Sequence, residues 1–225
     1  MTGTVGAEDV RARTAAVDGA AVAGLRASVE GQVLGLADDG YEEHRRVWNG
    51  SIDRRPAVIV RCAGVDDVRT AVRFGRDSGL TVAVRGGGHS FPGLSTVDGG
   101  LLVDLRPMAG VRVDPDARVA GVQAGALLGE VDAATQEHGL VVPSGIVSHT
   151  GVAGLTLGGG IGWVMRRYGL TVDSLESADL VTAEGEVVHA SEDENAELFW
   201  GCAGEAATSA WSPTSASACT PWGRR

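Results

Sequence analysis

Residues 81–90 read Thr-Val-Ala-Val-Arg-Gly-Gly-Gly-His-Ser, a short apolar run that leads directly into three glycines. The apolar part, residues 81–84, is predicted to be a buried strand. A similar run, Ala-Val-Ile-Val, occupies residues 57–60. Between the two runs, residues 66–76 carry valines and a phenylalanine mostly on one helical side, and Gly79 ends the pattern. Strand, helix and strand in about 30 residues indicate a βαβ unit with a parallel pair of strands.

The remaining elements differ in kind from this early βαβ pattern. A helix is expected over 21–36, another strand over 101–103 and a helix over 127–138. Turn signals at 114–116 and 184–185 predict hairpins over 111–122 and 179–190. An α/β beginning followed by a mixed or antiparallel part predicts an α/β (α+β) fold of two α/β lobes, rather than one doubly wound sheet.

The glycine loop, residues 86–90, is a candidate phosphate site. Three glycines leave backbone N–H groups uncovered by side chains, so that a phosphate oxygen can approach closely. Arg85 would add charge and Ser90 a hydroxyl donor. An ordinary glycine turn after a strand remains an equally open interpretation.

His89 lies directly after the three glycines. A lone histidine in a loop is usually solvated or hydrogen-bonded to the protein. Beside a glycine cradle, however, the imidazole is better interpreted as a contact to a cofactor.

A second glycine-rich stretch spans residues 145–162. It lacks the strand, G-x-G-x-x-G and acidic residue of a dinucleotide-binding Rossmann unit. It is also no P-loop, because the chain contains no lysine. Its glycines could serve only close packing of elements. Two such stretches in one chain nevertheless suggest a single extended ligand with a pyrophosphate.

Bulk composition excludes several function classes. The net charge of −10 argues against nucleic acid as a partner, because phosphate binding needs a basic face. No run of 18 or more apolar residues predicts a membrane span, and the first residues do not resemble a secretory signal. The three cysteines (Cys62, Cys202 and Cys219) have no metal-ligand spacing and fit a reducing compartment, so a cytoplasmic location is expected and no metal site.

Several separated motifs together resemble the FAD-linked oxidases of the vanillyl-alcohol-oxidase and p-cresol-methylhydroxylase superfamily. The similarity is greatest to its bacterial branch that resembles berberine bridge enzyme. The motifs fall in order at residues 41, 45–50, 55–56, 85–90, 104–105, 125, 139–140, 151–162 and 166–173. The resemblance covers roughly residues 30–200.

The resemblance implies two α/β lobes with FAD between them. Residues 85–90 would hold the pyrophosphate, and His89 would form the 8α-histidyl bond to the flavin. Residues 145–162 would line another side of the cofactor, and Val188 would belong to the strand near the adenosine. The cofactor-binding residues so predicted are Arg85, Gly86, Gly87, Gly88, His89, Ser90, Gly145, Ser148, Thr150, Gly151, Gly154, Gly158, Gly159, Gly160, Gly162 and Val188.

One departure from the family predicts a single covalent link. Some members attach FAD a second time through a cysteine in the second loop, and the matching position here is Val147. The catalytic base of the family normally comes from a later substrate domain, so no catalytic residue is expected in this chain. His149 and Tyr168, both near the loops, are assigned core or loop roles.

The predicted organisation has three parts: a loose segment over 1–30, an FAD-binding domain over 31–200 and an irregular tail over 201–225. The domain would divide into lobes of about 31–110 and 111–200. The resemblance implies oxidation of a small alcohol, sugar or amine-bearing metabolite, with electrons passed to O₂. A flavin-binding module without turnover, and an acidic carbohydrate- or protein-binding domain, are the alternatives.

The tail is also predicted to be out of frame. After Gly201 the helical and strand periods stop, and the segment becomes rich in Ser and Thr. GC-rich codons for 201–223, read from the third nucleotide, encode a glycine turn and a strand that resemble the family's next segment. A chain altered in this way is expected to be unable to turn over substrate alone.

Overall fold

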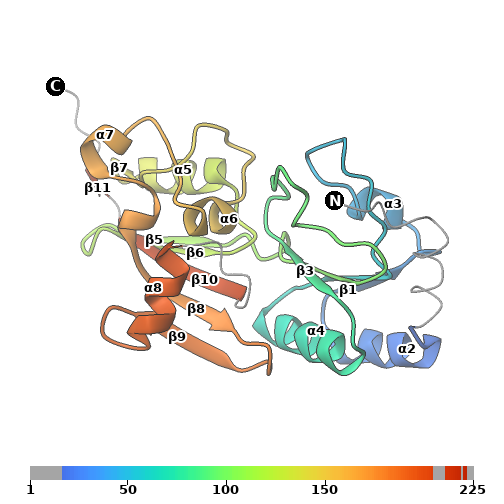
Figure 1. The fold of residues 1–225 in the computed structure, drawn as a ribbon. Coiled ribbons are helices and arrows are strands. Elements are labelled where there is room, and N and C mark those ends of the chain that lie inside the picture. Colours follow the sequence, from blue (N-terminus) through green and yellow to red (C-terminus); the bar gives the residue numbers. More distant parts are fainter. Residues whose placement is uncertain (1–16, 205–210, 219, 222–225) are drawn as a thin grey trace. The chain divides into compact units, whose positions relative to one another are not determined.

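The computed structural model describes residues 17–204, 211–218 and 220–221. The chain divides into two compact units (Figure 1). Of the described residues, the first unit comprises 17–107 and 183–185, and the second comprises 108–182, 186–204, 211–218 and 220–221.

The first unit contains a four-stranded sheet in the order β1-β2-β4-β3. Its strands are β1 (Gln32–Gly35), β2 (Val58–Arg61), β3 (Val82–Arg85) and β4 (Leu101–Asp104). β4 is parallel to both β2 and β3, and β1 is antiparallel to β2. The predicted βαβ strands are therefore parallel, but β4 lies between them, so that they do not pair directly.

Helix α4 (Val65–Asp77) connects β2 to β3 and packs through one apolar side. Val68, Ala71 and Val72 on this helix are buried. Gly75 allows the helix to approach the sheet, because a Cβ there would lie 2.6 Å from Cγ2 of Val82. The close approach explains a glycine in a helix interior, where it costs about 1 kcal/mol relative to alanine.

The beginning of the chain differs from the prediction. Residues Gly19–Ser28 form helix α2, whose first turn is capped by the Asp18 carboxylate accepting from the N–H of Ala20. The helix expected over 21–36 therefore ends early, and β1 follows it. The loose segment expected over 1–30 is ordered from α2 onward, and its first 16 residues lie outside the described part. Helix α3 (Tyr41–His44) follows β1.

The second unit contains an antiparallel five-stranded sheet in the order β5-β6-β10-β8-β9. Its strands are β5 (Val111–Asp114), β6 (Val119–Gln123), β8 (Leu175–Val181), β9 (Val187–Ser191) and β10 (Trp211–Ala218). Both predicted hairpins are confirmed as the antiparallel pairs β5–β6 and β8–β9. A short pair joins β7 (Leu140–Val141) to β11 (Thr220–Pro221).

Strand β10 corrects the expectation of an irregular tail. It pairs with β6 on one side and with β8 on the other, and thus occupies the centre of the sheet. Backbone hydrogen bonds make such a ladder possible without an alternating apolar pattern, which residues 211–218 do not have. The reading frame of the tail stays a prediction.

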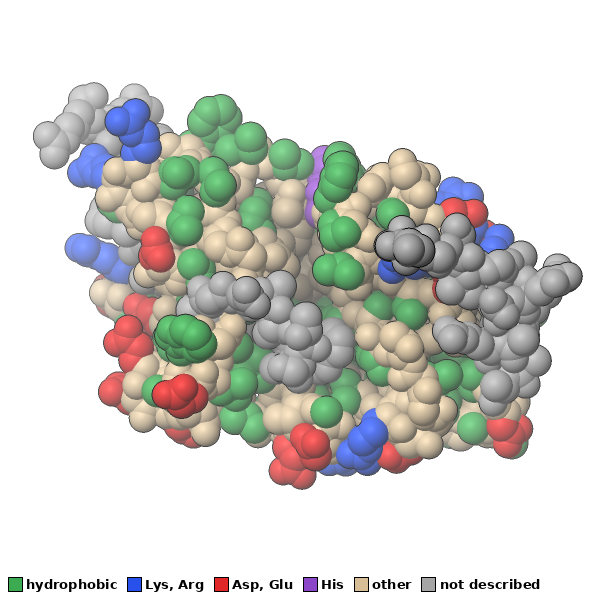
Figure 2. Space-filling model, in the orientation of Figure 1, with side chains coloured by type: hydrophobic (Ala, Val, Ile, Leu, Met, Phe, Trp, Pro, Cys, Tyr) green, Lys and Arg blue, Asp and Glu red, His purple; other side chains and the backbone are tan. Residues whose placement is uncertain are grey.

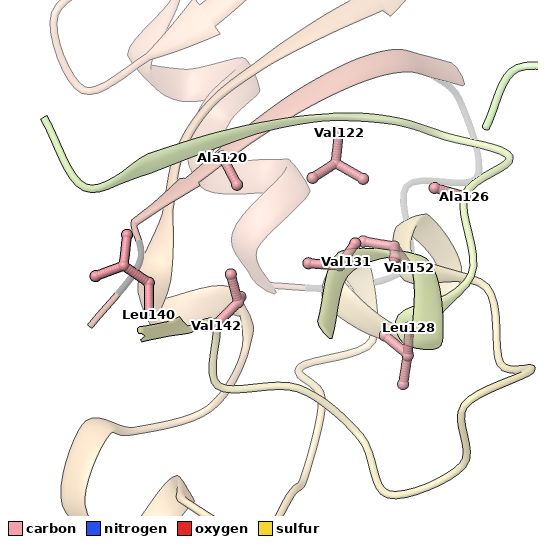
Figure 3. Packing of buried hydrophobic residues seen from close by; sticks show 8 residues of the cluster. All are labelled: Ala120, Val122, Ala126, Leu128, Val131, Leu140, Val142 and Val152. Atoms are coloured by element: carbon pink, nitrogen blue, oxygen red, sulfur yellow. The ribbon is translucent and has the colours of Figure 1, made fainter. Parts of the chain in front are cut away.

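Helices α5 (Leu128–Gln136) and α8 (Ala196–Gly204) pack on the sheet of the second unit. The unit also contains α6 (Val152–Leu157), α7 (Met165–Tyr168) and the 3₁₀ turn η1 (Val172–Ser174). Ala120 and Val122 of β6 face Val131 of α5 and Val152 of α6 (Figure 3). Within the described residues, no helix combines the length and the apolar character needed to cross a membrane.

Candidate functional site

The glycine loop of the first unit presents backbone donors at the end of a buried strand. Gly86 and Gly87 are half-buried, and their N–H groups have no hydrogen-bond partner among the described residues. Gly88 has a φ of +74°, a conformation that favours glycine and turns the chain sharply. Partly accessible, unpaired N–H groups next to such a turn are donors of the kind that bind an anion.

Arg85 does not extend into this loop, contrary to the role expected of its side chain. The guanidinium is buried, and its Nη2 donates to Oδ2 of Asp104 at 2.8 Å. Nη1 donates to the carbonyl of Arg46 at 3.1 Å. Because side chains alternate along a strand, Arg85 shares the inward face of β3 with Ala83. The Arg85 charge, which was expected to add to a phosphate site, neutralises a buried carboxylate.

Asp104 is the centre of a buried ionic cluster. Its side chain is fully buried, and Arg106 donates to it from both Nε and Nη2, at 2.9 and 2.8 Å. Burial raises the pKa of the Asp104 carboxyl, but the hydrogen bonds from Arg106 and the charge of Arg85 outweigh burial and lower it. Nη2 of Arg106 also lies 3.2 Å from Nδ1 of His44, whose pKa is lowered by burial and by the neighbouring arginines.

Two hydroxyl groups after the glycine loop are candidate site groups that the sequence does not predict. Oγ of Ser95 and Oγ1 of Thr96 are buried and have no hydrogen-bond partner in the part of the chain that the structure describes. A buried polar group without a partner costs about 1–3 kcal/mol. Ser90, which was predicted, accepts the N–H of Leu94 with its Oγ at 2.9 Å. A single sequence does not show whether the hydroxyl of a loop serine or threonine has a hydrogen-bond partner.

In the second unit, the start of the predicted second loop packs along the beginning of α5. The N–H groups of Leu128 and Gly129 donate to the carbonyls of Thr150 and Ser148, at 2.9 and 2.8 Å. Gly145 fits closely, because a Cβ there would lie 2.4 Å from Cδ1 of Leu155. These contacts support the structural interpretation of this half of the loop.

The glycines of the other half fall into two kinds. A Cβ on Gly162 would lie 1.6 Å from the carbonyl oxygen of Ser144, and one on Gly160 would lie 2.2 Å from Oγ1 of Thr171. Packing within the unit therefore requires both glycines. Gly154, in contrast, is exposed on α6 and a Cβ there would meet nothing within 4 Å. Nothing within the described chain explains a glycine at Gly154.

The family model for an FAD binding domain matches residues 56–191, more than half of the chain. The chain belongs to this family. It is 37% identical over 177 residues to the (R)-6-hydroxynicotine oxidase of Paenarthrobacter nicotinovorans, covering 79% of the chain and 39% of that relative. It is also 37% identical to the glucooligosaccharide oxidase of Sarocladium strictum over 169 residues, covering 74% of the chain and 34% of the relative.

Solved structures agree with the assignment to the FAD-linked, berberine-bridge-enzyme-like oxidases. The crystal structure of 6-hydroxy-D-nicotine oxidase from Arthrobacter nicotinovorans matches with a TM-score of 0.84 and 34% identity, over 86% of this chain and 43% of that one. A glucooligosaccharide oxidase from Acremonium strictum, which carries a 6-S-cysteinyl, 8α-N1-histidyl FAD, matches with a TM-score of 0.84 and 31% identity, over 89% and 43%. The chain thus spans about two fifths of the length of these relatives.

The predicted fold is confirmed as a mixed α/β FAD-binding domain. Its predicted site residues fall in both units: residues 85–90 belong to the first, and residues 145–162 and Val188 belong to the second. Val188 is half-buried on β9, opposite Leu180 of β8. Contact of all these residues with one cofactor stays a prediction, as does the single link inferred from Val147, which is 41% exposed.

Large hydrophobic side chains are exposed beside both glycine-rich stretches of the FAD-binding domain. Figure 2 shows hydrophobic side chains at the surface of each unit. In the first unit, Trp48 and Phe91 are 57% and 75% exposed; in the second, Ile161 and Trp163 are 69% and 81% exposed. Exposed apolar groups near candidate binding loops are typical of a surface that a ligand or another protein segment covers.

Proposed function

We propose that the chain supplies the FAD-binding part of an oxidase that acts on a small alcohol, sugar or amine-bearing metabolite and passes electrons to O₂. The observation that carries the proposal is the cradle of unpaired N–H groups at Gly86 and Gly87, at the end of a buried strand, inside an FAD-binding domain. The substrate classes are inferred from the nicotine and glucooligosaccharide oxidases to which the chain is similar.

The residues present fit FAD in several respects. The pyrophosphate would accept from the backbone donors of the glycine loop, which need no side-chain charge. The orphaned hydroxyls of Ser95 and Thr96 would gain partners from the cofactor or its waters. FAD, when bound, would supply the hydride acceptor for the substrate, and the protein would bind and orient the cofactor.

We further propose that His89 carries the flavin through a single 8α-histidyl bond. The bond replaces an imidazole N–H and one C–H of the flavin 8α methyl by a C–N bond. The two protons and two electrons released pass to dioxygen, which becomes hydrogen peroxide. Imidazole is suited to this role because, in its neutral form, the unprotonated ring nitrogen is nucleophilic.

Covalent attachment is tested by measuring whether flavin stays on the protein after denaturation. Wild-type protein incubated with FAD should keep a yellow flavin after denaturation and gain the mass of one FAD. His89→Ala should lose all flavin on denaturation, whereas His138→Ala, at an exposed position on the other unit, should keep it. Circular dichroism controls for folding of each variant.

Two further outcomes separate the competing functions. Flavin that washes out of the folded wild-type protein in acid would contradict the covalent link and leave binding intact. Peroxide formation with nicotine-like amines or oligosaccharides distinguishes an oxidase from a flavin-binding module without turnover. A colourless protein after incubation with FAD would contradict the proposed function altogether.

Gly154→Ala is expected to raise stability while it weakens FAD binding. Alanine in an open helical position should stabilise the protein by about 0.5–1 kcal/mol. If the cofactor lies against this glycine, the added methyl group should raise the dissociation constant about tenfold, which corresponds to about 1.4 kcal/mol. Thermal unfolding measures the first effect. Flavin fluorescence in a His89→Ala background, where binding is reversible, measures the second.

Gly24→Ala is the matched control for Gly154→Ala. Gly24 lies in α2, is exposed, and a Cβ there would also meet nothing within 4 Å. It should give the same gain in stability with no change in FAD affinity. An unchanged affinity in Gly154→Ala as well would remove Gly154 from the cofactor site.

A further inference from the structure

The segment of residues 46–49 is bonded at three points to residues 85–91, which are the glycine loop and the residue on either side of it. The carbonyl of Arg46 accepts from Nη1 of Arg85 at 3.1 Å. The N–H of Trp48 donates to the carbonyl of Gly88 at 3.1 Å, and Nδ2 of Asn49 donates to the carbonyl of Phe91 at 2.8 Å. Two of the acceptors, at 88 and 91, bracket His89, so the backbone on both sides of His89 is fixed by this segment.

The Trp48 side chain adds a fourth contact, to His89 itself. The indole and imidazole rings are stacked, with their centroids 4.9 Å apart and their planes 20° from parallel. Trp48 is 57% exposed, so burial in the core does not set the orientation of its ring. A stacked partner contacts an imidazole through one face and not through the edge of the ring. The N–H bond and the lone pair of the basic nitrogen lie in the ring plane, at that edge.

We propose that Trp48 is a positioning residue for His89, holding the imidazole by its face in the orientation from which a ring nitrogen bonds to the flavin. The proposal rests on the proposed attachment through His89. Its two parts act together: the backbone N–H of Trp48 holds the loop, and its ring limits rotation of the imidazole. The backbone part survives any substitution except proline, so side-chain variants isolate the ring.

Stacking between aromatic rings is a modest interaction, and the expected effect is correspondingly modest. Removing the ring should slow covalent attachment about 3- to 10-fold. The affinity for FAD before the bond forms should change less than twofold, because the cradle donors at Gly86 and Gly87 belong to the backbone. A general disruption of the loop would instead weaken both the affinity and the rate.

The experiment compares Trp48→Leu, Trp48→Phe and Trp200→Leu. Trp200 is 74% exposed on α8 of the other unit and serves as the matched control. After FAD is added to the flavin-free protein, the fraction that survives denaturation is followed in time. Trp48→Leu should attach about 3- to 10-fold more slowly, Trp48→Phe should restore most of the rate, and Trp200→Leu should match the wild type.

A second measurement needs no flavin. In protein labelled at histidine, the ring protons of His89, assigned with His89→Gln, should be shifted by the ring current of Trp48. That shift should vanish in Trp48→Leu and return in part in Trp48→Phe. A wild-type attachment rate in Trp48→Leu would overturn the role of Trp48. A wild type that forms no bond at all would instead refute the attachment through His89, and the positioning role with it.

Discussion

Asp104→Asn is expected to destabilise the protein by about 3–5 kcal/mol, because it removes one partner of a buried ion pair. The Asp104 carboxylate is fully buried and receives hydrogen bonds from Arg85 and Arg106. Burial lowers the pKa of the Arg85 guanidinium, but arginine is so strongly basic that the group stays charged at neutral pH. The amide would therefore leave a buried positive charge uncompensated. Urea denaturation measures the loss.

Asp66→Asn is the matched control for the same chemical change at the surface. Asp66 pairs with Arg69 at 2.9 Å, but its side chain is 84% exposed. Its removal should cost less than about 1 kcal/mol. Similar losses in the two variants would contradict the argument that burial makes the Asp104 cluster a major stabilising element.

The stabilities of the wild type and Asp104→Asn should also depend differently on pH in acid. The pKa of Asp104 is lower in the folded protein than its usual value, despite the opposing effect of burial. A carboxyl whose pKa is lowered on folding stabilises the protein above its unfolded pKa of about 4, and this contribution is lost as the pH falls through the folded pKa. Wild-type stability should therefore decline below about pH 4. In Asp104→Asn this part of the decline should be absent.

The position of this cluster could have been predicted from the sequence. Three apolar runs of the first unit each end in a charged residue, at Arg61, Arg85 and Asp104. In the parallel sheet these residues are in register, with Asp104 of β4 between the other two. The sequence indicated that β2 and β3 are parallel. It did not indicate that β4 pairs in parallel between them, because pairing depends on contacts between distant segments.

The residues of the candidate site could likewise be predicted only in part. The glycine loop and His89 were recognisable, because their residue types and their place after an apolar run limit what they can do. The stack of Trp48 on His89 was not, since it joins residues 41 positions apart and Trp48 has no apolar period around it. The second loop was ambiguous for another reason: a glycine needed for packing and a glycine left open for a ligand look the same in a sequence.

Gly162→Ala addresses that ambiguity, and we expect it to destabilise the protein by about 3 kcal/mol, or roughly 6–12 °C in Tm. A methyl group at Gly162 would overlap the carbonyl oxygen of Ser144, at 1.6 Å, and the carbonyl carbon at 2.7 Å. Both atoms are backbone, so relief requires movement of a main-chain segment rather than rotation of a side chain. Thermal unfolding followed by circular dichroism measures the loss.

Gly154→Ala, eight residues earlier in the same glycine-rich stretch, makes the same chemical change where a Cβ meets nothing within 4 Å. Its effect on stability should have the opposite sign, a gain of about 0.5–1 kcal/mol. A gain or no change in Gly162→Ala would show that the loop at Ser144 yields readily. The close packing assigned to Gly162 would then be wrong. Gly162, like Gly154, would be a glycine that contacts within the chain do not explain.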